Sequence, residues 1–274
     1  PLQAKYFGGH FEMLEVDELA AFRQNIGEAE VEARVALFYQ NFEMDATCHP
    51  GDIREAALTS VALDRLVERY SLGSLVYYYK GTANSTNQTT ISSIILGTSL
   101  LTGRGIPVAG EYEIKNAQAM KIMDKFGAGG SFTEYYAMDY ADDVVIMGHD
   151  GPGHIAIAEG NVRVKPLQVY HGKVGSGLSL EMTVQHGPIT CLSVVETGKG
   201  ELILLVAEGA SVPGPTLKIG NTNSRYRFAI GARAFVQEWN GHGPAHHCAV
   251  GKGHIASKIK KLGALLQMEV RVVG

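Results

Sequence analysis

The spacing of apolar residues changes near residue 130, and this change limits the folds open to the chain. Upstream, residues 28–43, 53–70 and 112–126 carry apolar side chains at helical intervals, and short apolar runs such as residues 106–108 separate them. Alternation of strands with helices is typical of a parallel sheet covered by helices. We therefore expect residues 1–130 to form a Rossmann-like parallel α/β domain.

Downstream, the apolar runs are shorter and follow one another closely, which indicates a mostly-β region. Residues 197–200 (Thr-Gly-Lys-Gly) form a good hairpin loop between two of these runs. Residues 214–240 look irregular, and the chain closes with a helix near residues 254–266 and a strand at 269–273. This antiparallel meander predicts a barrel or a sandwich, and we expect residues 131–274 to form a β-barrel-like domain. The expected strands cover residues 132–136, 144–147, 154–158, 162–169, 181–184, 189–196 and 201–208.

Composition narrows the choice of partners and compartment. The chain has 274 residues and a formal net charge of −4, which does not suggest nucleic acid or an anionic membrane as a partner. Its three cysteines are far apart and form no Cys-x-x-Cys motif, so we expect neither a disulfide framework nor a structural zinc site. A reducing, cytoplasmic setting fits best. No apolar run reaches the ~18 residues of a membrane span.

Three residues with metal-ligating side chains stand where the chain is expected to turn. Glu111 follows the apolar run 106–108, Glu134 lies in an aromatic run, and His149 ends the apolar run 144–148. Two carboxylates and an imidazole at the ends of buried strands are a common way for an α/β frame to present a site. Each could equally be an ordinary loop-edge residue, so spacing alone leaves both interpretations open.

His246 and His247 are adjacent, between a Gly/Pro-rich loop and the last expected helix. Loops tolerate exposed imidazoles and metals bind the neutral ring, so this pair is a second candidate site. Cys248 beside it is a weak nucleophile candidate, because adjacent side chains seldom hydrogen-bond to each other. The chain has no nucleophile elbow and no Walker loop, and the glycines of residues 127–130 follow a helix instead of opening one.

Five short motifs follow one another from residue 110 to residue 247. Gly110-Glu111 precedes a helix, residues 131–134 read Ser-Phe-Thr-Glu, Gly148-His149 ends a strand, residues 185–188 read Gln-His-Gly-Pro, and residues 243–247 read Gly-Pro-Ala-His-His. They resemble the Gly-Glu-Gly-Asp, Ser-Phe-Met-Glu, Gly-x-His, Gln-Thr-Gly-Pro and Gly-Gly-Ala-His-His segments of the L-arabinose isomerases, in the wider L-fucose/L-arabinose isomerase superfamily. The resemblance covers the family's central and C-terminal domains and leaves its N-terminal α/β domain without a counterpart.

The sequence departs from the family at two of these motifs. Tyr112 and Glu113 stand where the family has Gly-Asp, and Asp-Gly-Pro-Gly follows His149 where the family has a more apolar run. Both differences bear on the identity of the sugar more than on the metal.

The resemblance implies a metal-dependent isomerase that interconverts an aldose and a ketose, most like L-arabinose and L-ribulose. It implies catalytic proton transfer by Glu111 and Glu134, and sugar contacts by His246 and Gln185. It also implies a homo-oligomer, a trimer or a hexamer, with sites at the subunit boundaries. The implied divalent ion, Mn²⁺ with Co²⁺ or Mg²⁺ as alternatives, would be held by Glu111, Glu134, His149 and His247.

Two other functions remain open. The first is a non-catalytic carbohydrate-binding or regulatory relative on the same frame. In this family a neighbouring subunit's N-terminal domain helps to close the site, and the resemblance finds no counterpart of that domain here. The second is an unrelated metal-dependent lyase or epimerase with similar ligands.

Overall fold

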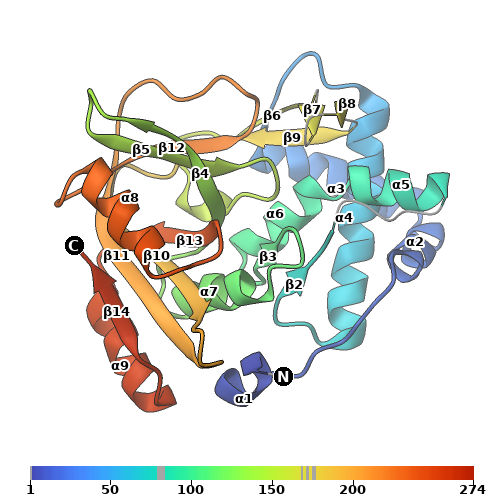
Figure 1. Ribbon diagram of the computed structural model, residues 1–274. Coiled ribbons are helices and arrows are strands. Elements are labelled where there is room, and N and C mark those ends of the chain that lie inside the picture. The colour runs from blue at the N-terminus through green and yellow to red at the C-terminus, as the bar shows by residue number, and fades with distance from the viewer. Residues whose placement is uncertain (1, 79–83, 168, 171–172, 175–176) are drawn as a thin grey trace.

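The computed structural model describes residues 2–78, 84–167, 169–170, 173–174 and 177–274 (Figure 1). Its α-helices are α1 Leu2–Phe7, α2 Val16–Gln24, α3 Glu28–Asn41, α4 Pro50–Tyr70, α5 Ser85–Ser92, α6 Ile95–Gly103, α7 Ile114–Lys125, α8 Ala232–Gly241 and α9 Ala256–Leu266. Its strands are β1 Glu43–Met44, β2 Leu75–Val76, β3 Val108–Ala109, β4 Ser131–Asp139, β5 Val144–His149, β6 Arg163–Pro166, β7 Val169–Tyr170, β8 Lys173–Val174, β9 Leu178–Glu181, β10 Gly187–Glu196, β11 Leu202–Val212, β12 Thr222–Phe228, β13 His247–Lys252 and β14 Val270–Val273.

Helices α3, α4 and α7 lie where the apolar spacing predicts them. The start of α4 is defined by His49, whose Nδ1 accepts a hydrogen bond from Gly51 N at 3.1 Å, and by Pro50 in the first turn. Its end is defined by Ser71, which takes the left-handed conformation that stops a helix. Between these signals one face of α4 is buried against α3 and α6, which forms much of the first core.

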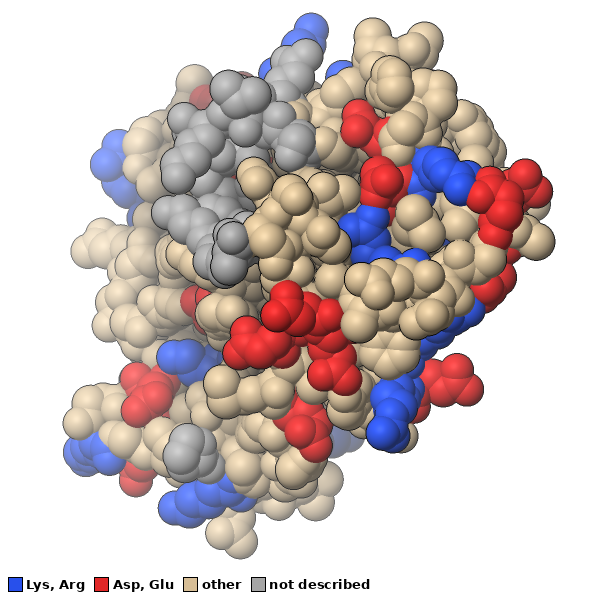
Figure 2. All heavy atoms as spheres, turned by 90° about the vertical axis from the view of Figure 1, so that its right-hand side faces the viewer, with Lys and Arg blue, Asp and Glu red and all other residues tan. Residues whose placement is uncertain are grey.

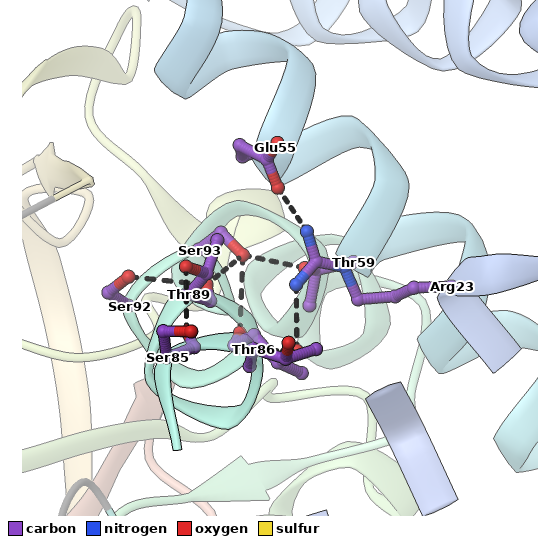
Figure 3. A network of polar contacts seen from close by, with 9 residues as sticks. Arg23, Glu55, Thr59, Ser85, Thr86, Thr89, Ser92 and Ser93 are labelled. Carbon is purple, nitrogen blue, oxygen red and sulfur yellow. Dashed lines mark hydrogen bonds and ion pairs between the residues drawn. The ribbon is translucent and has the colours of Figure 1, made fainter. Parts of the chain in front are cut away.

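A polar network ties α2, α4 and α5 together (Figure 3). Arg23 on α2 pairs with Glu55 on α4 and donates a hydrogen bond to Thr90 on α5 at 2.7 Å. Thr59 on α4 and Ser93, directly after α5, share a hydrogen bond of 2.6 Å in a buried position. These contacts supply the polar partners that the hydroxyl-rich α5 needs when it packs into the first core.

Acidic and basic side chains adjoin one another on the face that carries α2 and α5 (Figure 2). Ion pairs also join α3 to α4, where Arg54 pairs with Glu28 and Arg65 pairs with Glu30. Such exposed pairs contribute little to stability, roughly 0–1 kcal/mol each. Among the described helices, none combines the length and the apolar content needed to cross a membrane.

The fold is mixed α/β, with one sheet of seven strands in the order β10-β13-β4-β5-β12-β11-β14. β10 also pairs with β11, so the antiparallel pairings of six strands run in a cycle and return to β10. β14 adds to β11 in parallel. Among the described residues, strands of the first half form two parallel pairings, β2 with β3 and β1 with β6 from the second half. The Rossmann-like arrangement therefore stays a prediction.

Three of the sequence expectations are wrong at the level of single elements. Residues 214–240, which look irregular in sequence, contain β12 and α8. The sequence predicts a strand at residues 154–158, and the structure has a short 3-10 helix at Ile155–Ile157. It also predicts a strand at residues 181–184, and β9 ends at Glu181. β12 is rich in polar residues, and its partner strands come from elsewhere in the chain. The periodicity of apolar residues therefore does not reveal it.

Side chains on the large sheet alternate between two cores, as strand geometry requires. Leu204 and Val206 belong to a cluster with residues of α7 and α9, and Ile203 and Leu205 belong to a cluster with residues of α8. A third cluster joins α3, α4 and α6 to β6 and β9, so residues 162–167 and 178–182 pack with the first half of the chain. Because α7 lies against β10 and β13, its N-terminal end is held beside the ends of the central strands. The division into domains at residue 130 stays a prediction.

Candidate metal centre

Glu111 lies in the tight connection between β3 and α7. Glu111 and Tyr112 both have left-handed backbone conformations, with φ of 55° and 56°. Such conformations cost roughly 1–3 kcal/mol for a residue other than glycine and persist only where the surroundings enforce them. Here Tyr112 N donates to Tyr77 O at 3.1 Å and Glu113 N donates to Gly110 O at 3.0 Å. The connection is therefore a defined backbone shape that fixes the direction of the Glu111 side chain.

Glu134 lies on β4 between two strands that carry histidines. It stands opposite His247 on β13 and opposite Gly148 on β5. Gly148 admits no side chain, because a Cβ atom there would lie 1.8 Å from the carbonyl oxygen of Thr222. His149 follows at the end of β5, opposite Thr222 on β12. Pairing of the three strands therefore brings Glu134, His149 and His247 into one region from distant parts of the sequence.

The carboxylate of Glu111 spans the two buried imidazoles. Its Oε1 lies 4.0 Å from Nε2 of His149, and its Oε2 lies 4.0 Å from Nε2 of His247. Both histidine side chains are almost fully buried, at 3% and 0% exposure, and Glu111 is 26% exposed. Two atoms bound to one ion at about 2.1 Å each can lie up to about 4.2 Å apart. Each separation by itself is short enough for the two atoms to bind one ion, and the two histidines face different oxygens of the Glu111 carboxylate.

His247 is oriented by a second carboxylate. Its Nδ1 lies 3.4 Å from Oε1 of Glu113, and its Nε2 is buried and makes no hydrogen bond with any described residue. A carboxylate at Nδ1 favours the tautomer that carries its proton there, which leaves the Nε2 lone pair facing Glu111. The hydrogen bond with His247 also lowers the pKa of Glu113, against the opposing effect of burial. This is the arrangement that a metal-ligating histidine requires, so the residues present fit a divalent ion.

Phe132 forms the floor beneath both imidazoles. Its ring centroid lies 4.4 Å from that of His149 and 4.5 Å from that of His247, and its side chain is fully buried. Gly110 allows this packing, since a Cβ atom there would lie 3.2 Å from the Phe132 ring. The floor keeps water from the buried side of the histidines, which strengthens electrostatic interactions within the centre.

Glu134 and His246 occupy the open side. Glu134 Oε2 lies 3.8 Å from Nε2 of His246, whose side chain is 61% exposed. Burial raises the pKa of Glu134, and the nearby carboxylates of Asp150 and Glu111 act in the same direction, while His247 opposes them. Burial also lowers the pKa of His246. A carboxyl group with a raised pKa beside a neutral imidazole is suited to proton exchange with a bound molecule.

The structure brings some of the expected site residues together and leaves others further from the centre. Glu111, His246 and His247 offer candidate ligand atoms that lie within 4.8 Å of one another. His149 is connected to this group by its 4.0 Å approach to Glu111. Glu134 is connected to it by its 3.8 Å approach to His246. Gln185 is exposed, and its backbone N donates a hydrogen bond to Ile157 O at 2.8 Å. Among the described residues, no hydrogen bond or ion pair joins its side chain to the centre.

Two acidic residues belong to the centre without having been expected there. Glu113 faces His247, and Asp150 Oδ1 lies 3.4 Å from Nδ1 of His149. Both stand within two residues of an expected ligand, and that proximity is the signal in the sequence that could have marked them. Glu113 provides a carboxylate at the Nδ1 side of His247, the usual partner of a metal-bound imidazole. Nδ1 of His149 instead accepts a hydrogen bond from Gly151 N at 3.1 Å, with Asp150 beside it.

No family model matches the sequence, and no curated protein matches it. The connection with the L-arabinose isomerases therefore rests on the five motifs alone.

Proposed function

We propose that the protein is a metal-dependent aldose–ketose isomerase of the L-arabinose isomerase type. The observation that carries this proposal is the position of Glu111, with one carboxylate oxygen 4.0 Å from Nε2 of each of two buried histidines. The motifs around these residues supply the reaction class, which the geometry of the centre does not define by itself.

The donor atoms favour a particular group of ions. Glu111, His149 and His247 offer oxygen and nitrogen, and no cysteine belongs to the candidate cluster. Mixed carboxylate and imidazole ligands suit Mn²⁺ or Co²⁺, with Mg²⁺ as a further possibility, and the lack of thiolate argues against structural zinc. Such an ion, when bound, supplies Lewis-acid polarisation of the sugar carbonyl, worth several kcal/mol.

The two glutamates take unequal parts in this proposal. Isomerisation moves one proton between C1 and C2 of the open-chain sugar and others between O1 and O2. Glu134 has the raised pKa and lies beside the exposed His246, so it accepts and returns the carbon-bound proton. Glu111, which lies between the histidines, would help to hold the ion and assists proton exchange at the sugar oxygens. His246 faces solvent beside Glu134 and contacts a sugar hydroxyl.

The finer description of the fold belongs to the same proposal. A central Rossmann-like domain followed by a β-barrel-like domain is supported by the parallel β2–β3 pair and by the cyclic pairing of six antiparallel strands. The open side at His246 is where a neighbouring copy in a trimer or hexamer would cover the site. Contact of Gln185 with sugar remains a prediction of the resemblance, and a cytoplasmic location remains a prediction from the scattered cysteines.

The decisive experiment is an isomerisation assay on Mn²⁺-loaded protein with L-arabinose, in which sugar chromatography separates the products. We expect L-ribulose from the wild type and none from folded Glu111→Gln, while Glu196→Gln, an exposed glutamate on β10, turns over normally. Unchanged turnover by Glu111→Gln would sink the assignment. Binding of L-arabinose without product would favour the non-catalytic relative, and a different product would favour a lyase or an epimerase.

A further inference from the structure

A buried imidazole–carboxylate pair lies behind the metal centre. His154 Nε2 is 2.9 Å from Oδ1 of Asp124, and the two side chains are 4% and 11% exposed. Asp124 is in the last turn of α7, and His154 lies five residues beyond His149. Neither residue touches the proposed ion, and the proposed reaction uses neither.

The pair joins the far ends of two segments that start at the centre. α7 begins directly after Glu111 and Glu113 and runs to Asp124. The segment 150–154 begins directly after His149 and runs to His154. The near ends meet where Glu111 faces His149, and the far ends meet where Asp124 faces His154. The two segments therefore form a closed frame, with the Glu111–His149 separation as one side.

Other contacts stiffen this frame at its far corner. His154 N donates to Ser131 Oγ at 3.3 Å, and Gly153 N donates to Ser99 Oγ at 3.2 Å. Gly129 lies under the His154 ring, where a Cβ atom would be 3.1 Å from the imidazole. Lys252 N donates to Ala128 O at 2.8 Å, so the turn after α7 also holds β13, the strand that begins with His247. All three ligand-bearing segments thus converge on this corner.

The pair is a poor source of stability. Asp124 Oδ2 and His154 Nδ1 are buried and form no hydrogen bonds within the described part of the chain. Buried pairs with unsatisfied atoms cost free energy, and replacing such a pair with apolar side chains is often neutral or stabilising. We propose that His154 and Asp124 are a positioning pair that holds Glu111 and His149 at the separation required for the divalent ion. This proposal rests on the metal centre proposed above.

The test compares thermal stability with Mn²⁺ affinity in the full chain. In the double variant Asp124→Leu/His154→Leu, the apo-protein should unfold at or above the wild-type temperature. Its dissociation constant for Mn²⁺, measured from the electron paramagnetic resonance signal of the free ion, should be about tenfold higher or more, as for other outer-shell changes. The single variant Asp124→Asn keeps an acceptor for His154, so its affinity for Mn²⁺ should stay within about twofold of wild type. Lys125→Ala, an exposed change on the same turn, is the matched control and should change neither quantity.

Two results would overturn the inference. One is wild-type Mn²⁺ affinity in the folded double variant. If that variant is unfolded by circular dichroism, Asp124→Glu decides, because it keeps the charge while its longer side chain displaces His154, and unchanged affinity then refutes a positioning role. Failure of the wild type to bind Mn²⁺ would instead refute the metal centre itself, so the two failures are distinguishable.

Discussion

Glu113 Oε1 lies 3.4 Å from Nδ1 of His247, on the side of the imidazole away from Glu111. The ring is therefore held between two carboxylates, one at each nitrogen. Glu113 directly precedes α7, and Glu111 stands two residues earlier. One short connection therefore supplies both a candidate ligand, Glu111, and the carboxylate that orients His247. The connection between β3 and α7 thus determines much of the chemistry of the centre.

Glu113→Gln should weaken Mn²⁺ binding by about tenfold or more, because a neutral amide is a poorer acceptor for Nδ1–H and no longer enforces one tautomer. Isothermal titration with Mn²⁺ on the apo-protein measures this. Glu196→Gln serves as the exposed control. Equal affinities for Glu113→Gln and wild type would show that Glu113 has no role in orienting His247.

Mn²⁺ should raise the unfolding temperature of the wild type, because an ion that binds only the folded state adds free energy of unfolding. At a concentration about 100-fold above the dissociation constant this amounts to about 2.7 kcal/mol. A thermal shift assay with Mn²⁺, and then with a chelator, should show the rise and its reversal. Glu111→Gln should lose most of the rise, and a shift of wild-type size in this variant would argue that the ion binds elsewhere.

Gly148→Ala should destabilise the protein by about 3 kcal/mol or more, because overpacking against rigid backbone cannot be relieved by a rotamer change. The new methyl group would lie 1.8 Å from Thr222 O and force β5 away from β12. Urea unfolding measures the loss. Gly73→Ala, whose Cβ atom would meet nothing within 4 Å, is the control and should be close to wild type.

Glu30 should make part of the stability depend on pH. Its pKa is lowered, first by the hydrogen bond from Gly27 N and then by Arg65. A carboxyl group with a lowered pKa in the folded state stabilises the protein above its unfolded pKa, and this contribution is lost as pH falls through the folded pKa. The difference in unfolding temperature between wild type and Glu30→Gln should therefore be full above about pH 5 and shrink in more acidic buffer. A difference that is constant from neutral to acidic pH would contradict this.

The segments with strong local signals were predictable from the sequence. α4 has a cap, an N-terminal proline and a continuous apolar face, and β10 and β11 are long apolar runs joined by a glycine-containing loop. β12 was missed because its interior includes buried Asn223, Ser224 and Arg225, which resemble a loop. Their partners come from outside the strand: Asn223 bonds to Leu217, and Arg225 pairs with Asp142. Tertiary contacts of this kind are invisible to periodicity.

The candidate metal centre was also only partly predictable from the sequence. Glu111, Glu134 and His149 could be selected as candidates because each stands where the chain is expected to turn, and His247 because it is paired with His246 beside a Gly/Pro-rich loop. Their combination into one ligand set came from the family resemblance. Their different surroundings could not be foreseen, since the opposition of Glu134 and His247 depends on the register of β4 against β13. The same holds for Glu113, whose importance follows from the rotation of the His247 ring, and for Gln185, which the fold leaves exposed.

The pairing of β4 with β13 has a consequence for the order of events during synthesis. His247 is supplied by a strand near the end of the chain, so a ribosome releases Glu111, Glu134 and His149 long before their last partner exists. Contacts between such distant segments form late, because the intervening chain must be ordered first. The ion proposed above would therefore meet its full set of ligands only after β13 has paired with β4.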